Sequence, residues 1–138
     1  MGFTVYYRST RTVTPAESDA VRQAARAANA GRTWLGCEPV HFFPDHDGHL
    51  TGGSKPNFTP HPDDAASAAR SGLPDGTTRD LLDVLCQLGR AHGIDWALSH
   101  DHDPDIGEIR GGVCDESVLA QIEAFVALGE VLGELGLE

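Results

Sequence analysis

The stretch FTVYYRSTRTVTPAE, from Phe3 to Glu17, leads from a strand into a helix and so sets the start of the fold. Apolar side chains stand at every second position of its first half, a period that predicts a strand with one apolar face ending near Val13. Thr14 then suits the N-cap of a helix, Pro15 suits its first position, and the glutamate at the end of the stretch completes a capping box. The sequence therefore predicts a strand followed directly by a helix.

Similar patterns along the rest of the chain predict an α+β fold. After the first strand and helix the order is strand, strand, helix, strand, strand, helix, with a short alanine-rich helix opened by Pro62 after the third strand. The first six main elements match the split β-α-β arrangement of a ferredoxin-like plait. Right-handed crossovers would place the first strand beside the third and fourth, with the helices on one face. The later strands are predicted at 38–43, 50–55, 96–99 and 106–110, and the last two helices are predicted to begin at Thr77 and Asp115.

Length and element order together predict one globular domain over residues 1–138. We expect the plait, strand-helix-strand-strand-helix-strand, to be extended by a fifth strand and a C-terminal helix. Prolines make the segment at about 56–76 irregular. The apolar stripe of the C-terminal helix continues to Leu135.

The balance of charges excludes some classes of partner. The chain has a formal net charge of −11 with only ten basic residues, so neither a nucleic acid nor an acidic membrane surface is an expected partner. A basic protein or a cation fits this charge better. No apolar run approaches the ~20 residues that span a bilayer, and the N-terminus lacks the basic and then apolar pattern of a signal peptide. We therefore expect a cytoplasmic protein.

Three cysteines occur without a C-x-x-C pair, which argues against a disulfide framework and against a cysteine zinc site. Cys86 falls in a helical apolar pattern and is predicted to lie in the core. Cys114 precedes a helix, where the helix dipole would lower the pKa of its thiol. The sequence places no histidine beside it, so we do not predict a nucleophile there.

The stretch VHFFPDHDGHLTGGSKPNF, from Val40 to Phe58, holds three of the seven histidines and the only lysine. Its Pro-Asp-His-Asp-Gly run consists of residues that suit tight turns. Imidazole and carboxylate groups also bind zinc, nickel or iron, but the spacing matches no metal-binding pattern. We predict a hairpin turn in which His46 and His49 face solvent and share no ligand.

The run Gly52-Gly53-Ser54-Lys55 has some of the residues of a phosphate-binding loop. The first glycine of that motif is missing, and Pro56 follows where a helix should begin. A bulge, or the close approach of another part of the chain to the third strand, explains the glycine pair better.

A second histidine cluster, His100 and His102, lies at the end of the fourth predicted strand. Side chains two apart on a strand share a face, so these imidazoles would supply half of a metal site. The plait would bring the segment after the third strand to the same edge, where His61 and Asp63 would complete a site for zinc or nickel. The alternative is a solvated acidic turn between the fourth and fifth strands, which accounts for the same residues without a metal.

One face of the predicted sheet is left without a helix. Aromatic and charged side chains alternate onto this face, a mixture typical of a binding surface, although an ordinary solvated sheet face has the same pattern. The residues predicted for this surface are Tyr6, Arg8, His41, Phe43, Glu108 and Arg110.

The sequence contains neither a nucleophile elbow nor a glycine-rich cofactor fingerprint, so catalysis is not predicted. We expect a small module that binds a macromolecule, in the manner of an immunity or adaptor protein facing a basic partner, or that associates with itself as a homodimer. The alternative is a metal-binding protein or a metal-dependent hydrolase that uses the clustered histidines.

Overall fold

The computed structural model describes residues 4–57 and 61–134, with positions 126, 130 and 132–134 described by their backbone alone. Phe3 and Leu135, which the sequence predictions included, lie outside the described residues. The chain forms a single small α+β domain in which all strand pairs are antiparallel and the sheet order is β2-β1-β3-β4-β5. The elements are β1 (Val5–Ser9), α1 (Pro15–Asn29), β2 (Thr51–Ser54), α2 (Pro62–Ser71), α3 (Thr78–His92), β3 (Trp96–His100), β4 (Asp103–Arg110), β5 (Val113–Cys114) and α4 (Glu116–Glu134).

The predicted caps set the ends of α1 and α3. The Thr14 hydroxyl accepts a hydrogen bond from the N–H of Glu17, and the Glu17 carboxylate accepts one from the N–H of Thr14, both at 3.1 Å. Thr77 and Asp80 form the same reciprocal capping box at the start of α3. Gly93 ends α3 with a φ of 64°, a conformation that glycine adopts without strain. These helix boundaries are confirmed.

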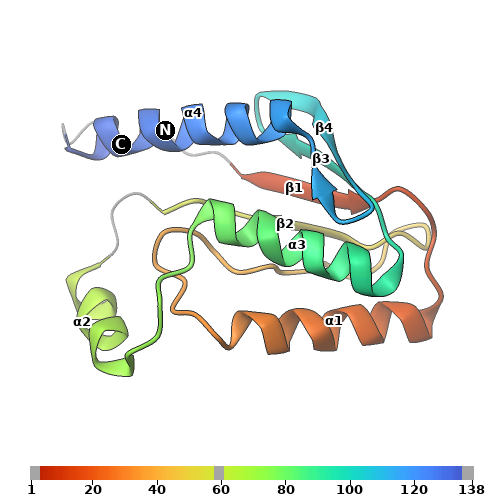
Figure 1. Ribbon diagram of the computed structural model, residues 1–138, viewed down its shortest axis with the longest axis horizontal. Helices are drawn as coiled ribbons and strands as arrows, with labels where there is room; N and C mark the ends of the chain where they lie inside the picture. The colour runs from red at the N-terminus through yellow and green to blue at the C-terminus, as the bar shows by residue number, and fades with distance from the viewer. Residues whose placement is uncertain (1–3, 58–60, 135–138) are drawn as a thin grey trace.

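Three helices form one layer over the sheet. In Figure 1, α4, α3 and α1 run side by side across the molecule, with α3 in the middle. Strands β1 and β3 turn every second side chain toward this layer, beginning with Val5 and Trp96. Between helices and sheet, Trp96 meets Tyr7 edge to face at a centroid distance of 6.5 Å and stacks on Phe42 at 5.6 Å. The core therefore lies on one side of the sheet.

The second predicted strand, 38–43, is not a strand in the structure. The segment runs antiparallel to β2, but a single isolated bridge, between Phe42 and Gly52, takes the place of a continuous ladder. Pro39 has no N–H to donate to a ladder. The Tyr7 hydroxyl also intervenes, since it donates to the carbonyl of His41 at 3.0 Å and accepts from the N–H of His41 at 2.8 Å. Side chains thus replace part of the expected backbone pairing.

Helix α2 stands apart from the rest of the domain, at the lower left of Figure 1, and none of its residues is buried. His61 caps its first turn by accepting a hydrogen bond from the N–H of Asp63 at 3.1 Å. Gly72 ends the helix with a φ of 72°. The predicted helix opened by Pro62 is confirmed, and local caps define both of its ends.

Strand β5 pairs only with the last two residues of β4, and two carboxylates in the earlier part of β4 bond to its own backbone. Asp103 accepts a hydrogen bond from the N–H of Asp105 at 3.0 Å, and Asp105 accepts one from the N–H of Gly107 at 3.2 Å. Pro104, between the two aspartates, has no N–H. The carboxylates of this stretch therefore bond to the backbone of their own strand.

Asp115 stands at the start of α4, as predicted, but its carboxylate bonds to the sheet and not to the helix. It accepts a hydrogen bond from the N–H of Glu108 at 3.1 Å, while its own N–H donates to the carbonyl of Glu108 at 3.1 Å. The start of α4 is thereby fastened to β4. No helix within the described part of the chain is long and apolar enough to cross a membrane.

Candidate functional site on the open face of the sheet

The side of the sheet away from the helix layer, here called the open face, carries two exposed aromatic rings. Tyr6 and Phe43 are 38% and 39% exposed. They flank Gly53: a Cβ atom on this glycine would lie 3.0 Å from Tyr6 Cδ1 and 3.3 Å from Phe43 Cζ. The exposed His41 ring meets Phe43 edge to face, with centroids 5.6 Å apart. Three of the six residues predicted for this surface are therefore gathered around one glycine.

Beside these rings the open face is hollowed over β3 and β4. The hollow has a volume of about 650 Å3. Its floor is low because Ala97 and Ser99, which alternate with buried residues of β3, have small side chains. The side chains at its floor and rim include Arg8, Ala97, Ser99, Asp105, Glu108 and Arg110.

The charges at the rim of the hollow balance. Arg110 donates from Nε to Oε2 of Glu108 at 2.7 Å, and this hydrogen bond raises the pKa of Arg110 above its ordinary value. The side chain of Arg8, on the interior strand β1, is exposed and forms no hydrogen bond or ion pair with the other described residues. With Asp105 the rim holds two guanidinium and two carboxylate groups, in a protein of net charge −11.

The histidine-rich stretch forms the predicted hairpin turn. His46 and His49 exchange backbone hydrogen bonds of 3.2 and 2.9 Å, and Asp47 and Gly48 between them have φ angles of 52° and 78°, as two-residue turns require. His46 faces solvent. His49 does not do so fully, which corrects the prediction: it is half-buried, and its Nδ1 donates to the carbonyl of Ser9 at 2.8 Å.

The glycine pair of β2 is explained by close packing, as predicted. A Cβ atom on Gly52 would collide with the carbonyl oxygen of His41 and with the ring of Tyr7. After β2, the next helix begins only at Pro62. Within the described residues, therefore, Lys55 does not lead directly into a helix as the lysine of a phosphate-binding loop does.

The structure does not assemble the predicted metal site. Among residues 4–57 and 61–134, no group of three or more histidine, cysteine, aspartate or glutamate side chains is placed to hold a metal ion. His61 and Asp63 contact each other at the exposed start of α2. They do not form a ligand group with His100 and His102.

His100 and His102 lie in different surroundings, because β3 ends at His100 and His102 belongs to the turn that follows. His100 is buried and accepts at Nδ1 a hydrogen bond from the N–H of His102 at 3.0 Å, whereas His102 is exposed. Both rings pack against Phe125 of α4, with centroids 4.7 and 5.9 Å from it. The pair thus connects the β3–β4 turn to α4.

The three cysteines are poor nucleophiles. Burial, and next the neighbouring Cys86, raise the pKa of Cys114 to about 11, opposite to the lowering expected from the helix dipole. Burial likewise raises the pKa of Cys37 to about 12. Cys86 is buried in the core, as predicted. Thiols with raised pKa values are unreactive near neutral pH.

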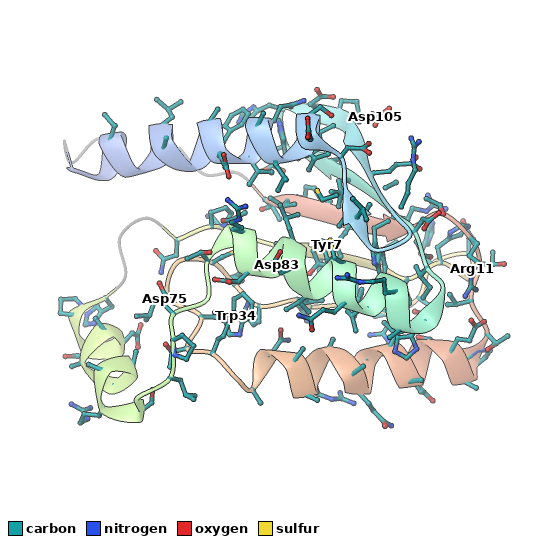
Figure 2. All side chains as sticks on the ribbon, viewed as in Figure 1. Tyr7, Arg11, Trp34, Asp75, Asp83 and Asp105 are labelled. Carbon is teal, nitrogen blue, oxygen red and sulfur yellow. The ribbon has the colours of Figure 1, made fainter. Side chains whose placement is uncertain are left out.

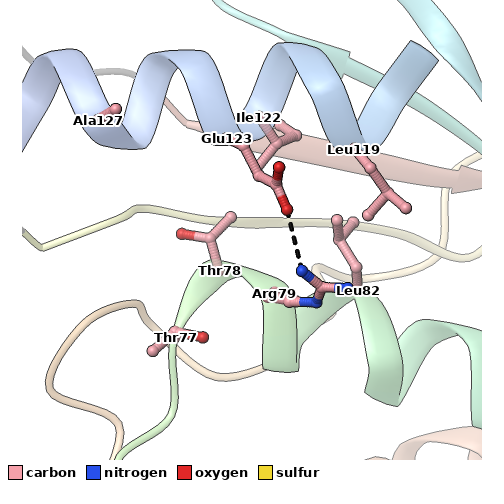
Figure 3. Close-up of a pocket in the computed structure, with 8 residues that line it drawn as sticks. All are labelled: Thr77, Thr78, Arg79, Leu82, Leu119, Ile122, Glu123 and Ala127. Atoms are coloured by element: carbon pink, nitrogen blue, oxygen red, sulfur yellow. Dashed lines mark hydrogen bonds and ion pairs between the residues drawn. The ribbon is translucent and has the colours of Figure 1, made fainter. Parts of the chain in front are cut away.

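A smaller pocket lies between α3 and α4 (Figure 3). It has a volume of about 230 Å3, and Leu82, Leu119 and Ile122 form its apolar walls. An ion pair between Arg79 and Glu123 joins the two helices across it at 3.0 Å. Apart from this pair and two threonines, its described lining has no polar side chain to orient a ligand, so the open face is the better candidate site.

The hollow on the open face was not predicted from the sequence. The sequence feature that indicates such a hollow is the pair of small residues, Ala97 and Ser99, that alternate with large apolar residues in the fourth predicted strand. Asp105 was interpreted as part of a turn, whereas β4 already begins at Asp103 and carries Asp105 to the rim.

The chain matches no protein-family model, no curated protein and no solved structure. The geometry of the open face is therefore the basis for a functional proposal.

Proposed function

We propose that the protein is an interaction module that binds a partner protein on the open face of its sheet. The observation that carries this proposal is the pair of exposed rings, Tyr6 and Phe43, beside a hollow with two arginines at its rim. Aromatic residues and arginine are the side chains enriched at binding hot spots. A hollow of about 650 Å3 offers room for a side chain of the partner.

The charges of the open face narrow the kind of partner. Because Arg8 and Arg110 balance Asp105 and Glu108, the surface favours a partner with charges of both signs over a uniformly basic one. The overall charge of −11 disfavours a nucleic acid.

We also propose that the sheet is a ferredoxin-like plait. In this plait the segment 38–43 takes the place of the second strand without forming a continuous ladder of backbone hydrogen bonds. It is supported by the pairing of β1 with both β2 and β3, by the packing of α1 against α3, and by the position of 38–43 beside β2. An experimental structure in which this segment left β2 would contradict the proposal.

Site-specific photo-cross-linking tests the binding function. Tyr6 is replaced by p-benzoylphenylalanine, which keeps an aromatic ring at this position, and the variant is irradiated in cells that naturally make the protein. We expect a discrete cross-linked protein adduct at position 6. The matched control carries the same group at Leu73, which is 44% exposed in the loop between α2 and α3. No adduct at position 6, or the same adduct at both positions, would contradict the proposed function.

A further inference from the structure

We propose that the partner on the open face is a second copy of this chain, so that two molecules pack sheet to sheet around a two-fold axis. This inference rests on the proposed function, because it names the occupant of the same surface. Three properties of the surface support it: the balance of its charges, the order of residues in one cross-strand row, and the position of Tyr6 relative to the hollow.

The charge balance makes self-association electrostatically feasible at this surface. Two molecules of net charge −11 repel each other as they approach. On the open face this repulsion is offset locally, because Arg8 and Arg110 stand beside Asp105 and Glu108. A two-fold interface requires a surface complementary to itself, and a surface that carries both signs of charge meets this requirement.

One cross-strand row is complementary to itself. Arg8 on β1, Ala97 on β3 and Glu108 on β4 are direct neighbours across the sheet, so roughly 10 Å separates the outer two. A two-fold axis along β3, midway between the stacked sheets, exchanges β1 of one molecule with β4 of the other. It thereby places Arg8 over the partner's Glu108 at both ends of the row. The small side chain of Ala97 at the centre lets the sheets approach.

Glu108 has the capacity for this second contact. Arg110 of the same molecule bonds to Oε2, while Oε1 accepts no hydrogen bond from the other described residues. A carboxylate can receive two guanidinium groups, one on each oxygen. The incoming Arg8 would therefore add to the existing ion pair without displacing it.

The same axis brings an aromatic ring to the hollow. Tyr6 pairs with Ser99, whose side chain lines the hollow. The ring of Tyr6, however, lies beside Gly53 of β2 and so does not fill the hollow of its own molecule. Exchange of β1 with β4 places the partner's Tyr6 over the part of β4 opposite Ser99, where Asp105 and Gly107 line the hollow. Each molecule thus offers one ring and receives one, which fills both hollows.

Charge-reversal variants test this arrangement by sedimentation. Wild-type protein is expected to form dimers at micromolar concentration, and Arg8→Glu and Glu108→Arg are each expected to raise the dimer Kd at least tenfold, because each places like charges together at both ends of the row. A 1:1 mixture of the two variants is expected to restore dimers, since every pair in the mixed dimer is again opposite in charge. Arg26→Glu, at an exposed arginine of α1, is the matched control and leaves the Kd unchanged.

A second variant tests the ring without changing charge. Tyr6→Ala is expected to raise the dimer Kd at least tenfold, whereas Leu73→Ala, at an exposed apolar residue elsewhere, leaves it unchanged. Self-association is overturned if wild type remains monomeric at high micromolar concentration, or if the charge-reversed mixture fails to dimerise. A monomeric wild type that still cross-links through position 6 to a different protein overturns this inference alone; the absence of any adduct there overturns the proposed function as well.

Discussion

At the scale of single residues, Tyr7 links the core to the segment that covers β2. It lies in the interior, behind α3 in the view of Figure 2. Its hydroxyl lies 2.8 Å from Ser54 Oγ, in addition to its two hydrogen bonds with the backbone of His41. Burial raises the pKa of Tyr7 to about 12, so the hydroxyl stays protonated and remains a donor across the range in which the protein is handled.

We predict that Tyr7→Phe lowers the free energy of unfolding by about 1–3 kcal/mol, because it leaves the N–H of His41 and other buried polar groups without their partner. Tyr6→Phe removes a hydroxyl from the preceding residue of β1, whose side chain is exposed. This control is expected to change stability by less than about 0.5 kcal/mol. Denaturant unfolding of both variants checks the prediction, and equal midpoints would contradict it.

At the scale of elements, the start of α1 combines a cap with an ion pair. Arg11 donates to Glu17 Oε2 at 2.7 Å, and Thr14 donates its N–H to the same carboxylate. These hydrogen bonds, the one from Arg11 foremost, lower the pKa of Glu17 to about 2. The folded value lies below the unfolded one, so this contribution to stability is complete above the unfolded pKa and is lost as the pH falls toward 2.

We predict that Thr14→Ala lowers the free energy of unfolding by ~1 kcal/mol, the usual effect of removing an N-cap oxygen. Thr10→Ala removes an exposed threonine hydroxyl outside the helix and serves as the control. Denaturant midpoints at neutral pH provide the measurement. A midpoint that Thr14→Ala leaves in place would mean that the cap does not stabilise α1.

Elements with local signals were the predictable ones. The capping residues of α1 and α3 act on their own neighbours in sequence, so Thr14 and Thr77 revealed both helix starts. The segment 38–43 depends on distant groups: the Tyr7 hydroxyl and the Asn29 amide, which donates to the carbonyl of Val40 at 3.0 Å, take backbone partners that a strand would use. Its apolar alternation therefore predicted a strand that long-range side-chain bonds prevent.

At the scale of the whole molecule, the candidate surface was predictable and the metal site was not. Alternation along β1 alone places Tyr6 and Arg8 away from the helices, and this needs no knowledge of the other strands. The metal hypothesis required four residues from separate elements to converge. In the described residues these four side chains do not form one ligand group, because His61 caps α2 and His102 lies in a turn rather than on a strand.

The carboxylates along β4 have a further consequence for the behaviour of concentrated protein. A bare strand edge is a template on which other chains can add strands and grow into ordered aggregates. Asp103 and Asp105 bond to the backbone of β4 itself and place negative charge on this strand, and in Figure 2 Asp105 lies at the periphery of the molecule.

We predict that Asp103→Ala shortens the lag before thioflavin-positive fibrils appear on prolonged shaking, because it removes a charged side chain from the strand next to the sheet edge. Asp19→Ala removes one negative charge from the exposed side of α1 and uncovers no strand, so its lag should match that of wild type. Equal acceleration by both variants would show that the effect comes from the change in the net charge of the protein. A shorter lag for Asp103→Ala alone would mean that the two aspartates of β4, each bonded to its own strand, keep the sheet of this protein from adding further strands.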